Sequence, residues 1–206
     1  MTRIKICGMT NKPDAIAAAE LGVDMLGFVF YKKSKRYVEP GAAEEIANEL
    51  PPSVAKAGVF VDAGQEDVVR IAEDVGLDIL QFHGDETPEY CDYFKTRFKV
   101  IKAFSLKDRK DLKKINDYGA DFYLLDTYRS DAAGGTGKAF DWKILKDFEF
   151  LRPVILSGGL TPENVVAAIS QVAPFGVDVS TGVEASPGRK DPELMKKFVE
   201  NVRKAG

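Results

Sequence analysis

The sequence predicts an α/β fold, a single (β/α)8 TIM barrel that takes up residues 1–206 as one domain. Eight short apolar runs alternate with segments of helical spacing, and eight is the number of units that closes such a barrel. The length of 206 residues lies near the lower end for this fold. An open doubly wound sheet is the alternative, and no linker rich in Pro, Ser or Gly divides the chain.

Eight strands are expected along the chain, each a short run rich in apolar and β-branched residues. Their first residues lie near Arg3, Met25, Val54, Asp78, Lys99, Asp121, Pro153 and Phe175. The runs 54–61, 122–126 and 154–157 are largely apolar and do not alternate with polar residues. Strands that are buried on both faces have this composition, which predicts a parallel sheet covered by helices.

Helices are expected between the strands. Apolar stripes with i, i+3, i+4, i+7 spacing occur at residues 68–75, 165–172 and 195–202. Three segments each predict a helix N-terminus, with a capping side chain, a proline and an acid: Thr87-Pro88-Glu89, Thr161-Pro162-Glu163 and Asp191-Pro192-Glu193. Gly22 and Gly76 are expected to end helices in the left-handed conformation.

The composition argues against several classes of partner. The chain has 29 Lys and Arg against 32 Asp and Glu, with no strongly basic region, so no nucleic-acid surface is expected. The N-terminus lacks an apolar signal core and no apolar run approaches ~20 residues, so no membrane association is expected. Two cysteines and one histidine predict neither a disulfide framework nor a usual metal site, and they fit a cytoplasmic location.

The loops after the seventh and eighth strands contain the strongest local signal for a ligand. Active sites of such barrels lie at the carboxyl ends of the strands, and these two loops are the usual phosphate site. Glycine lets the backbone approach an anion closely, so we expect phosphate binding here, with a simple tight turn as the alternative. The residues concerned are Gly158, Gly159, Asp178, Ser180, Thr181 and Gly182.

Cys7 and Asp126 end the first and the sixth expected strand. A lone cysteine is most often a small buried apolar residue, as we expect for Cys91, but a strand end makes Cys7 a candidate base or nucleophile. Asp126 is either a strand-end cap or an acid that apolar neighbours keep protonated. The two strands are three apart in a ring of eight, so both side chains are expected to flank one ligand from nearly opposite sides.

Two further side chains and one loop lie at expected strand ends. Arg36 follows the second strand, either as part of a solvated basic loop or as a bidentate partner of a substrate carboxylate. His83 follows the fourth strand, where a structural hydrogen bond is favoured over a catalytic role. The glycine-rich segment 134–137 matches neither a P-loop nor a dinucleotide fingerprint, and a mobile lid or an ordinary flexible loop is expected there.

Seven motifs occur in order along the chain. They are KICGMT at 5–10, GFVF at 27–30 with SKRY at 34–37, QFHG at 81–84, LDT at 125–127, GGTG at 134–137, LSGGL at 156–160 and DVSTGVE at 178–184. Together they resemble the phosphoribosylanthranilate isomerase family over most of the chain. Met9 and Phe82 stand where other apolar residues are expected, and the segment 128–133 differs from the pattern of the family.

The resemblance implies a cofactor-free isomerase of tryptophan biosynthesis, acting on one small phosphorylated substrate that carries an anthranilate carboxylate. N-(5-phosphoribosyl)anthranilate would become the 1-deoxyribulose form by an Amadori rearrangement, with Cys7 as general base and Asp126 as general acid. Arg36 would hold the carboxylate, and the loops at 158–159 and 180–182 would hold the phosphate. His83 and Asp178 would complete the binding site, in a monomer or a homodimer.

The residues alone are also compatible with three other functions. Another phosphosugar enzyme on the same barrel, such as the neighbouring ring-forming lyase, is the first. A non-catalytic sensor of a phosphorylated ligand is the second. A thiol redox protein using Cys7 is the third, and it is disfavoured because the other cysteine, Cys91, lies far along the chain in an expected helix.

Overall fold

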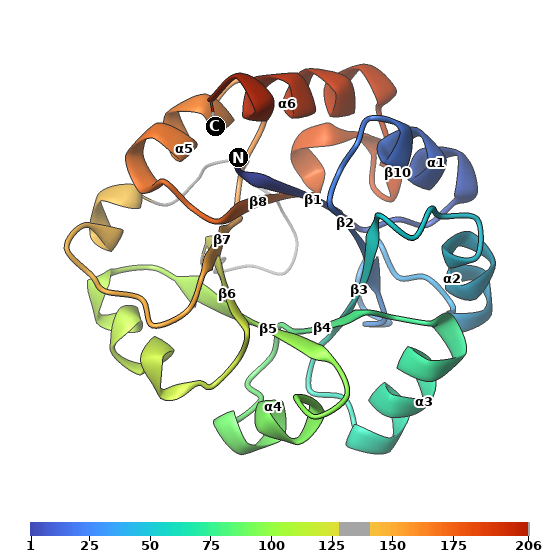
Figure 1. Ribbon diagram of the computed structural model, residues 1–206, viewed down its shortest axis with the longest axis horizontal. Coiled ribbons are helices and arrows are strands. Elements are labelled where there is room, and N and C mark those ends of the chain that lie inside the picture. Colours follow the sequence, from blue (N-terminus) through green and yellow to red (C-terminus); the bar gives the residue numbers. More distant parts are fainter. Residues whose placement is uncertain (128–140, 206) are drawn as a thin grey trace.

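The computed structural model, described over residues 1–127 and 141–205, is a closed barrel of eight parallel strands inside a ring of helices (Figure 1). The strands follow the chain order around the ring, and β8 pairs with β1 to close it. Their bounds are β1 Arg3–Cys7, β2 Met25–Val29, β3 Ala55–Phe60, β4 Ile79–Phe82, β5 Lys99–Leu106, β6 Phe122–Thr127, β7 Val154–Leu156 and β8 Gly176–Val179. The predicted fold is confirmed, and each strand begins at the expected residue or one residue after it.

The connections between the strands are helical but not uniform. The α-helices are α1 Lys12–Glu20, α2 Pro40–Ala47, α3 Gln65–Val75, α4 Pro88–Phe94, α5 Val165–Val172 and α6 Pro192–Ala205. After β5 and β6 the described connections contain 3-10 helices, η1 Arg109–Asp117 and η2 Trp142–Leu145. In η1 only Leu112 and Ile115 are buried, so a full apolar stripe for an α-helix is missing there.

The segment after β8 contains an element that the sequence did not predict. A short 3-10 helix, η3 Thr181–Val183, leads into an antiparallel pair of strands, β9 Glu184–Ser186 and β10 Arg189–Lys190. Gly188 turns the chain between these strands with a φ of 81°, a conformation that favours glycine. This hairpin brings Glu184 and Lys190 back towards the end of β1.

Two of the three predicted helix starts are confirmed. The Thr87 side chain accepts a hydrogen bond from Tyr90 N at the start of α4, and Asp191 Oδ1 accepts from Glu193 N at the start of α6. The prediction at Thr161 is wrong by one turn, because α5 begins only at Val165. The intervening residues form a turn in which the Asn164 side chain bonds Thr161 N and Gly159 O.

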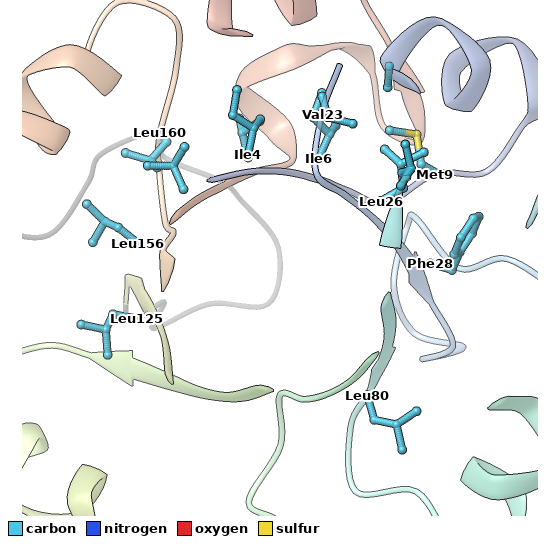
Figure 2. Packing of buried hydrophobic residues seen from close by; sticks show 14 of the residues in the cluster. Ile4, Ile6, Met9, Val23, Leu26, Phe28, Leu80, Leu125, Leu156 and Leu160 are labelled. Atoms are coloured by element: carbon cyan, nitrogen blue, oxygen red, sulfur yellow. The ribbon is translucent and has the colours of Figure 1, made fainter. Parts of the chain in front are cut away.

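The apolar core lies mainly between the barrel and its helices. Figure 2 shows Ile4, Ile6, Leu125 and Leu156 directed outward from their strands, where they pack with helix residues. Because side chains alternate along a strand, the residues between them face the barrel interior. The interior contains a second, smaller apolar cluster, formed by Met25, Ala57, Ile79, Ile101, Ala103, Leu124 and Ile155. Polar side chains follow these residues towards the carboxyl ends of the strands, which places a polar site above an apolar floor.

Candidate active site

Cys7 ends β1 at the polar end of the barrel, as the sequence predicted. Its residue exposure is 8%, and its sulfur packs against β2. A Cβ on Gly27 would lie 2.7 Å from Cys7 Sγ, so glycine is required for this approach. The Cys7 carbonyl accepts a hydrogen bond of 2.6 Å from Lys190 Nζ, which ties the end of β1 to β10.

Two buried cations and one buried carboxylate act on the Cys7 thiol. Lys5, on the same inner face of β1, donates to Asp178 Oδ1 at 2.8 Å. Burial raises the pKa of Cys7, the charge of Lys5 lowers it, Asp178 raises it and Lys190 lowers it. The net effect is a raised pKa. The sequence analysis did not anticipate these lysines as the groups that favour ionisation of the thiol.

Arg36 is held by a carboxylate that the sequence analysis did not select. Its Nε lies 3.0 Å from Glu184 Oε1 and its Nη2 lies 2.6 Å from Oε2, a bidentate pair. Lys190 Nζ also contacts Glu184 Oε1 at 3.1 Å. Burial opposes ionisation of Glu184, but the hydrogen bonds and charges of Arg36 and Lys190 lower its pKa below the usual value. Arg36 therefore sits in a fixed orientation at the barrel mouth.

Asp126 lies near the end of β6 and contacts His83, the first residue after β4. His83 Nε2 is 3.3 Å from Asp126 Oδ2, and Thr127 N donates to Asp126 Oδ1 at 2.6 Å. Gln81 Nε2 lies 3.1 Å from His83 Nδ1. With Gln81 as donor, Nδ1 is the acceptor, and the proton of the neutral ring lies on Nε2, facing Asp126. The hydrogen bond expected of His83 is therefore made with Gln81, and its Nε2 lies close to a predicted acid.

The loops after β7 and β8 lie against each other and against the end of β6. Gly158 has a φ of 81°, and a Cβ there would overlap Thr127 N and lie 2.6 Å from Asp126 Oδ1. A Cβ on Gly182 would overlap the carbonyl of Leu160 in the neighbouring loop. Glycine at both positions allows this close packing. The predicted phosphate loops are thus adjacent to each other and to Asp126.

The structure brings most of the predicted site residues together at one end of the barrel. Asp178 differs, because it lies inside the barrel at 5% exposure, where Ser157 Oγ donates to Oδ2 at 3.1 Å and Lys5 to Oδ1. Lys5, Glu184 and Lys190 were missed. For Lys5 a signal exists in the sequence, since a lysine between Ile4 and Ile6 in a buried strand points inward with Cys7.

Other expectations concern metals, membranes and the lid. Within residues 1–127 and 141–205, no three His, Cys, Asp or Glu side chains group as metal ligands. In the same part of the chain, no helix combines the length and the apolar character needed to cross a bilayer. The predicted lid at 134–137, with the adjoining segment 128–133, lies outside the described residues.

The fold and the site define the class of protein as a (β/α)8-barrel enzyme. A thiol and a carboxyl from different strands, with glycine-lined loops beside them, share the end of the barrel where such enzymes place their catalytic groups. Residues 4–201 match the profile of the family N-(5'phosphoribosyl)anthranilate (PRA) isomerase. The chain therefore belongs to the phosphoribosylanthranilate isomerase family, which confirms the resemblance found in its motifs.

Individual relatives agree with this membership. An N-(5'-phosphoribosyl)anthranilate isomerase from Geobacter sp. (strain M21) is 48% identical over 204 residues, 99% of each chain. The crystal structure of phosphoribosyl anthranilate isomerase from Thermotoga maritima is 44% identical, with a TM-score of 0.92 over 99% of this chain and 100% of that chain. A second structure, 41% identical with a TM-score of 0.87 over 99% and 100% of the two chains, is a complex with reduced 1-(o-carboxyphenylamino)-1-deoxyribulose 5-phosphate.

Proposed function

We propose that the protein converts N-(5-phosphoribosyl)anthranilate into 1-(2-carboxyphenylamino)-1-deoxyribulose 5-phosphate, an isomerisation of tryptophan biosynthesis. The observation that carries the proposal is the thiol of Cys7 and the carboxyl of Asp126 at the same end of one barrel. Family membership and the relative's complex with the reduced carboxyphenylamino sugar phosphate support the substrate class. The reaction moves hydrogen within one molecule, so it consumes no oxidant or reductant.

Asp126 is proposed as the general acid. The ring oxygen of the ribose takes its proton as the bond from that oxygen to C1 breaks, which leaves a cationic imine at C1. His83, 3.3 Å from Asp126 Oδ2, is placed to hold the carboxylate that remains. A positioned acid of this kind typically contributes about 10²–10⁴-fold to the rate.

Cys7 is proposed as the general base. Its thiolate takes the proton from C2, whose acidity the neighbouring imine cation raises, and the electron pair of the broken C–H bond neutralises the imine as an enolamine. The enolamine then becomes the product ketone as C1 gains a proton and the hydroxyl on C2 loses one. Hydrogen is conserved overall.

The remaining predicted residues are proposed to bind the two anionic ends of the substrate. The Nη1 side of Arg36 is suited to the anthranilate carboxylate, because Glu184 holds the Nε and Nη2 side. The loops at 158–159 and 180–182 are proposed to hold the phosphate through backbone N–H groups. Asp178 contributes from beneath, through its bond to Lys5 and not by direct contact.

The cytoplasm is the proposed location, in agreement with the state of the two cysteines. Cys7 and Cys91 are both free thiols, and both are buried. Burial raises the pKa of Cys91 to about 12, which makes this second thiol unreactive at neutral pH.

The experiment that tests the function follows the loss of substrate fluorescence with the purified protein and with two variants. We expect turnover by the natural sequence and its loss in Cys7→Ala and in Asp126→Asn, while both variants still bind the product in a titration. Near-full activity in either variant would reject the role assigned to that residue. Release of carbon dioxide would indicate a lyase, and binding without turnover would indicate a sensor.

A further inference from the structure

Lys5 is a charged side chain inside the barrel, and its burial requires an explanation. It is 0% exposed, and its neighbours on β1, Ile4 and Ile6, are directed outward in Figure 2. Lys5 therefore shares the inner face of β1 with Cys7, two residues further towards the polar end. Its register partners are Met25 on β2 and Asp178 on β8. Taking an ammonium out of water into such a place is costly unless it is paired.

The pair that Lys5 forms is complete, but a buried ion pair is by itself weak evidence for a role in stability. Lys5 Nζ lies 2.8 Å from Asp178 Oδ1, and the other carboxylate oxygen accepts a hydrogen bond from Ser157. Replacing a buried ion pair by apolar residues of similar size is often neutral or stabilising. A barrel with an otherwise apolar inner cluster has no structural need for these charges. Their position beneath Cys7 points instead to the thiol.

We propose that Lys5 is the positioning residue that favours ionisation of the Cys7 sulfur inside the barrel, an inference that rests on the proposed role of Cys7 as the base. Lys5 touches no substrate in this scheme. It acts through the sulfur above it, and Asp178 holds its ammonium in place. The chain thereby supplies the buried thiol with a buried cation on the same strand, which stabilises the ionised form of the sulfur.

The charges around Cys7 support this assignment. Burial raises the pKa of the thiol, and Lys5 is the strongest of the groups that oppose this effect. Burial would lower the pKa of Lys5, but the charges of Asp178 and Cys7 raise it above its usual value, so the ammonium remains charged. The charge of Cys7 also contributes to the raised pKa of Arg36. Lys190 is the remaining cation, and its Nζ bonds the Cys7 carbonyl and Glu184.

The test measures alkylation of Cys7 by iodoacetamide against pH, in the absence of substrate, with mass spectrometry to locate the label. In Lys5→Met we expect the inflection of the Cys7 alkylation curve to move up by about one pH unit or more. Loss of a nearby opposite charge usually has an effect of this size. The labelling rate at pH 7 then falls about tenfold. The acid limb of the pH profile of kcat/KM moves in the same direction, since it reports the base of the free enzyme.

Lys102→Met is the matched control. Lys102 is 2% exposed, lies on β5 and pairs with Glu86 at 3.0 Å, so its loss also leaves a buried carboxylate without its lysine. Lys102 is not among the groups that act on Cys7. We therefore expect the Cys7 inflection of this variant to coincide with that of the natural sequence.

A second variant covers the case in which Lys5→Met does not fold. Lys5→Met combined with Asp178→Asn removes both charges, so no buried carboxylate is left unpaired. The inflection is expected to stay above that of the natural sequence, because Lys5 outweighs Asp178 in its action on the thiol. A Lys5 variant whose profile coincides with the natural one, or a shift that Lys102→Met reproduces, overturns the proposal. Labelling needs no substrate, so absence of isomerase activity in the natural protein would reject the proposed function separately.

Discussion

The two sides of the barrel mouth differ in how far their polar groups are withdrawn from water. The thiol side consists of Lys5, Cys7, Asp178, Glu184 and Lys190, and the carboxyl side consists of Gln81, His83, Asp126 and Thr127. The side chains of Lys5 and Lys190 are 0% exposed, whereas those of His83 and Asp126 are 26% and 17% exposed. A thiol that must lose its proton in a site withdrawn from water needs cations in fixed positions to stabilise the thiolate. The carboxyl of Asp126 is only partly withdrawn from water, and a histidine lies beside it.

Gly158→Ala is expected to have the largest effect, and it acts on the carboxyl side. The new Cβ meets Thr127 N and lies 2.6 Å from Asp126 Oδ1, at a backbone φ of 81° that alanine rarely adopts. Displacement of the acid by about 1 Å typically lowers turnover about 10²-fold, which steady-state kinetics would measure. Alkylation of Cys7 in the same variant should remain normal. Loss of both properties would mean that the two sides are not independent.

Glu184→Gln is expected to have the next largest effect, on the thiol side. It leaves Arg36 and Lys190 without a buried anionic partner, and breaking such a group typically costs about 3 kcal/mol of the free energy of unfolding. Denaturant titration would measure the loss. The control is Glu163→Gln, whose carboxylate pairs with Lys197 on the surface and should contribute less than about 1 kcal/mol. Equal losses in both variants would contradict the contrast between buried and exposed pairs.

Acidic pH should reduce the contribution of the thiol side to stability, because Glu184 becomes protonated. Glu184 has a pKa below its usual value of 4.5 in the folded protein, so its charge stabilises the fold at pH values above the unfolded pKa. This contribution is lost as the pH falls from 4.5 through the lower folded pKa. The difference in unfolding free energy between the natural protein and Glu184→Gln should therefore shrink below about pH 4.5. A difference that stays constant down to pH 3 would contradict the ion pair.

Thr87→Ala is expected to have the smallest effect. Thr87 caps α4, the helix that follows the loop carrying His83, and its hydroxyl accepts from Tyr90 N at 3.3 Å. Loss of an N-cap typically costs about 1 kcal/mol of stability. Thermal unfolding would detect the loss, and both the Cys7 inflection and the turnover per folded molecule should stay unchanged. A change in either would show that the α4 cap positions the carboxyl side.

The sequence predicted the barrel well because its signals are local and repeated. Apolar runs, prolines at helix starts and glycines at helix ends each depend on a few neighbouring residues. Cys7 and Asp126 were found because a strand end has a known place in a closed barrel. The hairpin from Glu184 to Lys190 was missed, since two strands of three and two residues carry almost no periodic signal.

The buried pairs were harder to predict than the strands. Lys5 and Asp178 are 173 positions apart, and Arg36 and Glu184 are 148 apart. Which charges neutralise each other depends on strand register around the closed ring, and composition does not specify that register. The start of α5 was misplaced for a related reason. The Asn164 side chain holds the Gly159 carbonyl and thereby delays the helix by one turn.

The order in which the chain is made gives the bond between Lys190 and Cys7 a consequence in time. Cys7 leaves the ribosome before Lys190, which follows 183 positions later, and also before Asp178. Until these later residues have joined the first strand, Lys5 lacks its carboxylate partner and the Cys7 carbonyl lacks its hydrogen bond from Lys190. The surroundings of the thiol are thus completed only when β8 and the hairpin that follows it have been made.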